Sequence, residues 1–140
     1  MISDDSNNLP PQDNLIFSID VTLCAPAAFK GKSSGVTMIP FSATTEGKYF
    51  TGKSIINGCD TQISEQRGFS LSARYMLTGK DYTGAKCSIF IENNGTSLEN
   101  CLPKIKTDSE ALSFLEKAEL YSRVIPSPDG KMVIVKIFSK

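Results

Sequence analysis

The sequence predicts an all-β protein, an antiparallel up-and-down β-barrel of about eight strands with one short helix. Two observations carry this prediction. Apolar side chains recur at every second position in several segments, which is the period of a half-buried strand. Short turns separate these segments, and no helices lie between them as a parallel sheet would require. A closed barrel has no exposed sheet edge, which favours it over the alternative, a β-sandwich.

Period-two alternation locates the strands along the chain. Residues 15–23 and 69–77 alternate apolar and polar side chains most regularly. The same period, less regular, recurs in the other segments that turn residues bound. Strands are expected near residues 15–23, 35–45, 48–56, 60–66, 69–77, 86–92, 118–126 and 131–139.

Turn residues end the strands. Residues 24–34 contain Pro, Gly and Ser and are expected to form a loop. Asn57-Gly58 is a strong turn pair that ends the third strand, and Asn93-Asn94-Gly95 is expected to end the sixth. Residues 96–106 are expected to be irregular. Pro128-Asp129-Gly130 should join the last two strands as a hairpin, because Pro fixes φ and Gly accepts a positive φ.

One helix is expected after residue 106. Thr107-Asp108-Ser109-Glu110 has the spacing of a capping box, in which a hydroxyl and a carboxylate satisfy the free amides of a helix end. A short apolar stripe follows it. At about three turns, such a helix is marginal alone and must pack on the rest of the protein. The stripe consists of Ala111, Leu112, Phe114 and Leu115.

Length and charge restrict the organisation and the partners. The 140 residues suit one domain, and the polar, proline-containing residues 1–14 are expected to form a flexible tail before a single barrel domain over residues 15–140. Fifteen basic and fifteen acidic residues cancel, which gives no electrostatic basis for binding nucleic acid or an anionic membrane. No apolar run is long enough to span a bilayer, and the N-terminus lacks the pattern of a signal peptide. A cytoplasmic protein is expected.

The absence of histidine excludes several chemistries. With no histidine in the chain, it can contain no Ser-His-Asp triad, Cys-His dyad or histidine-ligated zinc site. The four cysteines, Cys24, Cys59, Cys87 and Cys101, lie far apart without a C-x-x-C pair, so we interpret them as free thiols. We expect no metal and no cofactor. Acid–base chemistry would have to use Asp, Glu, Tyr, Lys or Cys.

One motif points elsewhere at first sight. Gly47 to Ser54 reads G-K-Y-F-T-G-K-S and fits the phosphate-binding pattern G-x-x-x-x-G-K-S/T. A true phosphate loop opens a helix whose N-terminus faces the anion. Here only two residues separate Ser54 from the turn at Asn57-Gly58, so no helix fits. We therefore predict a strand, with Gly52 at a bulge or a close approach of two backbones.

The stretch from Gly47 to Gly95 resembles uncharacterised protein family 0311, also called domain of unknown function 3237. In that family the pattern runs as F-x-G, G-G-x-D-W, a D-G pair, D-A-R-Y, D-G and G. Several of its carboxylates and one aromatic are replaced here, which makes this chain a divergent member. The resemblance implies a small bacterial antiparallel β-barrel and no established activity. The matching residues are Gly47, Phe50-Thr51-Gly52-Lys53, Asn57-Gly58-Cys59-Asp60-Thr61-Gln62, Gly68, Ala73-Arg74-Tyr75, Leu77, Gly84 and Asn94-Gly95, and the replacements are Asn57, Thr61, Arg67, Ser72 and Thr83.

The candidate ligand-binding residues are Asp60, Gln62, Arg74 and Tyr75. If Arg74 faces the barrel interior with Ser72, the two would form a polar patch able to hold a carboxylate or a carbonyl group. Alternatively, this face meets solvent and Arg74 pairs with a carboxylate such as Asp60. Period-two alternation places Arg74 and Tyr75 on opposite faces, so both can line one pocket only if a bulge intervenes.

Three functional hypotheses remain open. The first is a small-molecule-binding β-barrel that forms a homo-oligomer. The second is an enzyme, a lyase or isomerase that acts on a small organic acid or carbonyl compound through a carboxylate, for which Glu65 and Glu92 are further candidates. The third is a structural or interaction module. An interior cavity lined by Asp60 or Arg74 would favour the first two, and a raised carboxylate pKa in it would favour the enzyme.

Overall fold

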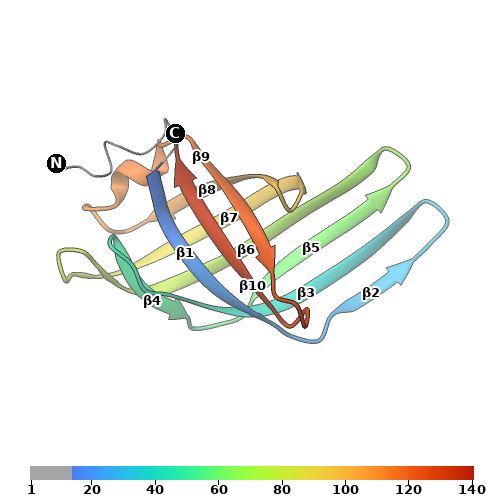
Figure 1. Ribbon diagram of the computed structural model, residues 1–140, viewed down its shortest axis with the longest axis horizontal. Helices are drawn as coiled ribbons and strands as arrows, with labels where there is room; N and C mark the ends of the chain where they lie inside the picture. The colour runs from blue at the N-terminus through green and yellow to red at the C-terminus, as the bar shows by residue number, and fades with distance from the viewer. Residues whose placement is uncertain (1–13) are drawn as a thin grey trace.

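The computed structural model describes residues 14–140 as a closed antiparallel barrel with eight strand positions and two extra strands, which confirms the predicted fold class (Figure 1). Of the expected tail over residues 1–14, residues 1–13 lie outside this described part, and Asn14 begins the first strand. The strands are β1 (Asn14–Leu23), β2 (Ala27–Lys30), β3 (Ser34–Thr45), β4 (Phe50–Ser54), β5 (Gly58–Glu65), β6 (Gly68–Asp81), β7 (Lys86–Ser97), β8 (Asn100–Thr107), β9 (Leu120–Pro126) and β10 (Met132–Ser139).

The barrel closes through β1. This strand pairs with β10 on one side and with β3 on the other, so the ring runs from β3 through β6, β7, β8, β9 and β10 back to β1. β4 and β5 share one position, because each pairs with both β3 and β6. β2 pairs with β3 outside the ring. The β2–β3 and β5–β6 hairpins extend together beyond the rest of the barrel (Figure 1).

Two strands occur where loops were expected. β2 lies within residues 24–34, and β8 begins within residues 96–106 at Asn100 and runs to Thr107. β8 has a strict alternation in which Cys101, Pro103 and Ile105 are buried while the residues between them are exposed. The turn-forming residues around it concealed this signal. Asn93-Asn94-Gly95 likewise does not end a strand, because β7 continues through it to Ser97.

The expected helix is reduced to one 3-10 turn, η2 (Ser113–Glu116). The capping box does not form. The Thr107 hydroxyl instead donates to the Ser88 carbonyl, 2.7 Å away, and the backbone N–H of Leu112 donates to Ser109 Oγ at 3.1 Å. The Thr107 hydroxyl is therefore used in a tertiary contact, as is the Ser109 hydroxyl, which donates to Asp81 Oδ2, while the bond from Leu112 to Ser109 is local. The prediction that this segment must pack is confirmed, because Leu112 and Leu115 are fully buried in the core.

The string from Gly47 to Ser54 is a strand, as predicted. β4 covers Phe50–Ser54 and is followed by a bend, with no helix after it. Gly52 marks a close backbone approach, because a Cβ atom there would lie 2.6 Å from the Thr78 carbonyl oxygen on β6. The segment therefore lacks the geometry of a phosphate-binding loop.

Candidate functional site

A cavity of about 220 Å³ lies inside the barrel. Its walls come from β1, β3, β5, β6, β7, β9 and β10, and it reaches the exposed Leu98 and the turn at Gly130. Asp60 is the one charged residue among those that line it. The apolar lining consists of Val21, Leu23, Ile39, Phe41, Leu71, Ala73, Leu98, Val124, Pro126, Val133 and Val135.

Strand register brings the polar lining residues together. Asp60 on β5 pairs directly with Ala73 on β6, and Ala73 pairs with Asn93 on β7. Directly paired residues point to the same face of a sheet, so these three side chains form a row on the inner wall. Neighbouring strands lie about 4.8 Å apart, which separates Asp60 and Asn93 by about 10 Å. The small Ala73 side chain leaves the space between them open.

Three buried polar atoms at this wall have no hydrogen-bond partner within residues 14–140: Asp60 Oδ1, the Tyr75 hydroxyl and Asn93 Oδ1. Tyr75 lies two residues beyond Ala73 on the same face of β6 and is 4% exposed, and Asn93 is 3% exposed. Leaving a buried polar atom unpaired costs about 1–3 kcal/mol, so such atoms are rare and each requires an explanation. Here all three belong to residues that line the same cavity.

Burial controls the charge of Asp60. Desolvation raises the pKa of this carboxyl, and a hydrogen bond from Gln62 partly opposes the rise. The Gln62 amide donates from Nε2 to Asp60 Oδ2 over 2.9 Å. Because Oδ2 already accepts this bond, Oδ1 is the oxygen left for a proton or for a ligand.

Tyr75 is held by tight packing. Its ring contacts Phe41 edge to face, with the centroids 5.1 Å apart. Gly58 lies against it, since a Cβ atom there would come within 2.5 Å of the Tyr75 Cβ. Burial raises the pKa of the Tyr75 phenol well above its usual value, so the hydroxyl keeps its proton and can donate a hydrogen bond.

Asn93 is a site residue that sequence reasoning missed, because it was assigned to a turn. Its Nδ2 donates to the fully buried Ser122 Oγ on β9, 2.8 Å away. This bond orients the amide and leaves Oδ1 as an acceptor at the cavity wall. Period two contained the signal, since Ile89, Ile91 and Asn93 continue one inward-facing series along β7.

The structure places Arg74 outside the cavity, so the interpretation with Arg74 and Ser72 facing inward is not supported. Arg74 Nη2 lies 2.6 Å from Glu92 Oε2 on β7, and 67% of its side chain is exposed. This agrees with the alternative, in which the face meets solvent and Arg74 pairs with a carboxylate, although that carboxylate is Glu92 and not Asp60. Ser72 also faces away from the interior and donates to Asn94 Oδ1 at 2.6 Å. No bulge interrupts β6, so Tyr75 faces inward and Arg74 outward.

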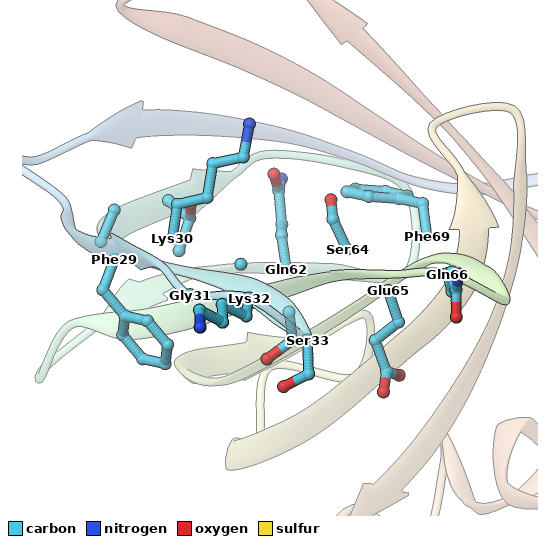
Figure 2. Close-up of a pocket in the computed structure, with 14 residues that line it drawn as sticks. Phe29, Lys30, Gly31, Lys32, Ser33, Gln62, Ser64, Glu65, Gln66 and Phe69 are labelled. Carbon is cyan, nitrogen blue, oxygen red and sulfur yellow. The ribbon is translucent and has the colours of Figure 1, made fainter.

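A second, open hollow of about 1030 Å³ lies between the two extended hairpins (Figure 2). Gln62 lines both this groove and the interior cavity, so it stands where the two meet. Figure 2 shows Lys30, Gln62 and Ser64 pointing to the same side, whereas Glu65 points away from them. The inner face of the barrel thus continues outward as a polar surface.

The described residues give little support for other site types. Within residues 14–140, no group of three or more His, Cys, Asp and Glu side chains could hold a metal ion. All four cysteines are free, as interpreted from the sequence; Cys87 and Cys101 are buried and the other two are partly buried. No helix among these residues is long and apolar enough to cross a membrane.

Comparison with known proteins relates this chain to other small barrels. No family model matches the chain, and no curated protein matches it. A protein of unknown function from Clostridium acetobutylicum superposes with a TM-score of 0.74 at 24% identity, covering 91% of this chain and 98% of that one. A β-barrel-like protein from Acinetobacter baumannii superposes with a TM-score of 0.67 at 22% identity, covering 94% and 98%.

An enzyme from Penicillium herquei is also similar in structure. It has a TM-score of 0.61 at 15% identity, with 93% of this chain and 97% of that chain covered. At these identities the likeness concerns the fold alone. The chain is thus an antiparallel β-barrel of a class that includes proteins without a known function.

Proposed function

We propose that this protein is a small-molecule-binding β-barrel whose ligand lies in the interior cavity. One observation carries the proposal: Asp60 Oδ1, the Tyr75 hydroxyl and Asn93 Oδ1 are buried without a hydrogen-bond partner among residues 14–140, and all three residues line the same cavity. A ligand with polar groups opposite these atoms would remove the cost of leaving them unpaired. A purely structural role would not account for a hollow interior with three such atoms on its wall.

The cavity size restricts the ligand. An engineered apolar cavity of about 150 Å³ binds benzene, so the 220 Å³ here suits one ring with one or two substituents. Apolar side chains form most of the wall, which favours an apolar body. The single carboxyl and its raised pKa favour a neutral molecule over an anion close to Asp60. We propose that the ligand enters past Gln62 from the outer groove.

Binding of matched probes tests the proposal. Toluene and p-cresol differ by one hydroxyl, and their affinity for the purified full chain can be measured by NMR titration. One net hydrogen bond contributes about 0.5–1.5 kcal/mol, so p-cresol should bind about two- to tenfold more tightly. Tyr75→Phe and Asn93→Leu should each reduce this preference. Arg74→Ala is the control, because Arg74 lies on the outer face, and it should leave the preference unchanged.

Native mass spectrometry of the same preparation reports any ligand that co-purifies and the oligomeric state. A bound small molecule that is lost in Asn93→Leu but retained in Arg74→Ala would support the proposal. If neither probe binds and Arg74→Ala changes the spectrum as much as Asn93→Leu does, the cavity is not a ligand site.

The remaining sequence predictions are proposals of the same kind. We propose a divergent member of uncharacterised protein family 0311 that is bacterial, cytoplasmic and homo-oligomeric. The neighbours from Clostridium acetobutylicum and Acinetobacter baumannii are bacterial, which supports a bacterial origin. Another neighbour comes from Penicillium herquei. That last neighbour is described as an enzyme, which supports keeping the enzymatic alternative for this chain.

A further inference from the structure

We infer that the cavity catalyses proton transfer at a carbon atom next to a carbonyl group, with Asp60 as the proton acceptor and Tyr75 as the hydrogen-bond donor to the carbonyl oxygen. This inference rests on the proposed binding function and makes the ligand an enolisable ketone or aldehyde. It goes further than binding because it assigns a separate chemical role to two of the unpartnered atoms.

The three polar side chains surround one small residue. Asp60 and Asn93 flank Ala73 directly across the strands, and Tyr75 follows two residues along β6. Diagonal neighbours of this kind lie about 7–8 Å apart at their Cα atoms. All three side chains project into the same space, and their polar atoms do not bond to one another. A molecule seated over Ala73 would therefore meet a carboxyl, a phenol and an amide oxygen together.

The step is balanced without any further reactant. Asp60 Oδ1 takes the proton from the α-carbon, and the C–H electron pair forms the new C=C bond. The carbonyl π pair moves to the oxygen, where the Tyr75 hydroxyl donates to the developing negative charge. Return of the proton from Asp60 to the same carbon, or to another carbon of the conjugated system, regenerates the carboxylate. The net reaction is hydrogen exchange or isomerisation.

The surroundings of Asp60 and Tyr75 suit a proton acceptor and a hydrogen-bond donor, respectively. A half-buried carboxylate with a raised pKa, such as Asp60, is a stronger base than a fully exposed one, and it also holds the proton long enough to return it. The phenol stays protonated, so it can stabilise an enolate in a site of low dielectric. Ile39 from β3 and the valines of β9 and β10 face Asp60 without charge. Tyr75 from β6 lines the same cavity, and the buried Cys101 thiol of β8 is close enough that the Asp60 charge contributes to raising its pKa.

Asn93 would position the substrate. Ser122 holds its Nδ2, so the free Oδ1 accepts a hydrogen bond from a hydroxyl or N–H group of the ligand. The acceptor lies about 10 Å from Asp60, which is two strand spacings. A ring with a carbonyl at one end and a donor at the other would span this distance.

Hydrogen–deuterium exchange of phenylacetone tests the inference. The benzylic CH₂ of this ketone exchanges slowly in D₂O, and ¹H NMR follows the exchange with and without the protein. We expect acceleration by the protein and build-up of the singly deuterated CHD product beyond the statistical amount that buffer catalysis gives, because a chiral site removes one of the two enantiotopic protons faster. The rate should rise with pH through one ionisation whose midpoint lies above the ordinary aspartate value of 3.8.

Variants separate binding from chemistry. Asp60→Asn should bind phenylacetone but exchange it no faster than buffer does. Tyr75→Phe should bind with an affinity lower by a few fold and exchange about 100- to 1000-fold more slowly, as expected when one donor to an oxyanion is removed. Arg74→Ala should match the wild type in both measurements.

Two outcomes would overturn the inference while leaving the binding function intact. One is phenylacetone that binds in an NMR titration but exchanges at the buffer rate. The other is accelerated exchange that persists in Asp60→Asn. A failure of binding itself, by phenylacetone and by p-cresol alike, would contradict both the inference and the proposed function.

Discussion

Two aspartates at different ends of the barrel, the half-buried Asp60 and the buried Asp81, have opposite hydrogen-bonding environments. Asp60 faces the interior cavity, where Oδ1 has no partner within residues 14–140 and burial raises its pKa. Asp81 lies at the far end of β6 and is 7% exposed. Hydrogen bonds, first from the Thr83 hydroxyl and then from Ser109, lower its pKa. One carboxylate keeps an oxygen without a partner among residues 14–140, and both oxygens of the other accept hydrogen bonds.

Asp81 lies at the end of β6 away from the β5–β6 hairpin. We call this the closed end of the barrel, because Asp81 bonds there to the segment that carries the buried Leu112. Its Oδ1 accepts bonds from the Thr83 N–H at 2.9 Å, the Thr83 hydroxyl at 2.6 Å and the Ala85 N–H at 3.3 Å. Its Oδ2 accepts from Ser109 Oγ at 2.7 Å, and the same hydroxyl oxygen accepts from the Leu112 N–H. This carboxylate therefore ties the β6–β7 turn to the segment that buries Leu112.

The contrast distinguishes a structural carboxylate from a functional one. Saturation by four donors stabilises a charged group that never needs to change its partners. An unsatisfied oxygen beside an empty space is costly unless something else occupies that space. The four predictions below test this distinction, in order of decreasing expected effect.

Truncation of Leu112 should destabilise the closed end most. Leu112 is fully buried in the core, so Leu112→Ala should cost about 2–5 kcal/mol of unfolding free energy in urea denaturation. Leu71→Ala, on the cavity wall, should cost less because its side chain already borders empty space. Equal losses of unfolding free energy in the two variants would mean that the cavity wall is packed as tightly as the closed end, which would contradict the proposed difference between the two ends.

Replacing each aspartate by asparagine should change the melting temperature differently at the two sites. Asp81→Asn places an NH₂ where only acceptors fit, so its melting temperature should fall clearly below that of the wild type. Asp60→Asn removes a carboxyl that burial disfavours in its charged form, so its melting temperature should stay the same or rise. Calorimetric melting of both variants at neutral pH checks this, and a larger fall for Asp60→Asn would contradict the assignment.

The pH dependence of stability should differ in sign between the two carboxylates. Asp60 has a raised pKa in the folded state, so its contribution is present below the ordinary value of 3.8 and is lost as the pH rises through the raised value. Asp81 has a lowered pKa, so its contribution is present above 3.8 and is lost as the pH falls through the lowered value.

Urea denaturation across the acid range measures both effects. Asp60→Asn should remove the decline in stability on the alkaline side of 3.8, and Asp81→Asn should weaken the loss on the acid side. If the slope of unfolding free energy against pH changes in the same direction in both variants, the two carboxylates do not have oppositely shifted pKa values.

Removing Arg74 should have the smallest effect. An exposed ion pair such as Arg74–Glu92 contributes about 0–1 kcal/mol, so Arg74→Ala should change the unfolding free energy by no more than that. Phenylacetone affinity should not change. A loss of affinity in this variant, with the unfolding free energy intact, would return Arg74 to the list of ligand-binding residues.

Regular alternation made most of the fold predictable. Residues 15–23 and 69–77 alternate most regularly, and both lie in long strands, although a register shift near Leu15 leaves that residue exposed and buries Ile16. β8 was missed because Pro103 and the asparagines before it are typical of loops, although every second residue is buried. Packing outweighs local propensity here. Burial of every second side chain between two neighbouring strands contributes more free energy than the low strand propensity of the turn-forming residues costs.

The site was predicted in part. Asp60, Gln62 and Tyr75 all line the cavity, whereas Arg74 does not. Their roles in binding stay predictions. Asn93 was missed because an Asn-Asn-Gly run favours a turn, although the period of two from Ile89 and Ile91 continues to it and β8 pairs with it.

The sequence by itself determined the strand class, the antiparallel order and the opposite orientation of Arg74 and Tyr75, because these follow from period two and from short turns. Only the tertiary structure decided which of the two faces lies inside, because that depends on closure between β1 and β3 and on the register of distant strands. It also decided which polar groups find partners. Asp81 meets Ser109 across 28 positions of the chain, whereas Asp60, Tyr75 and Asn93 meet a cavity.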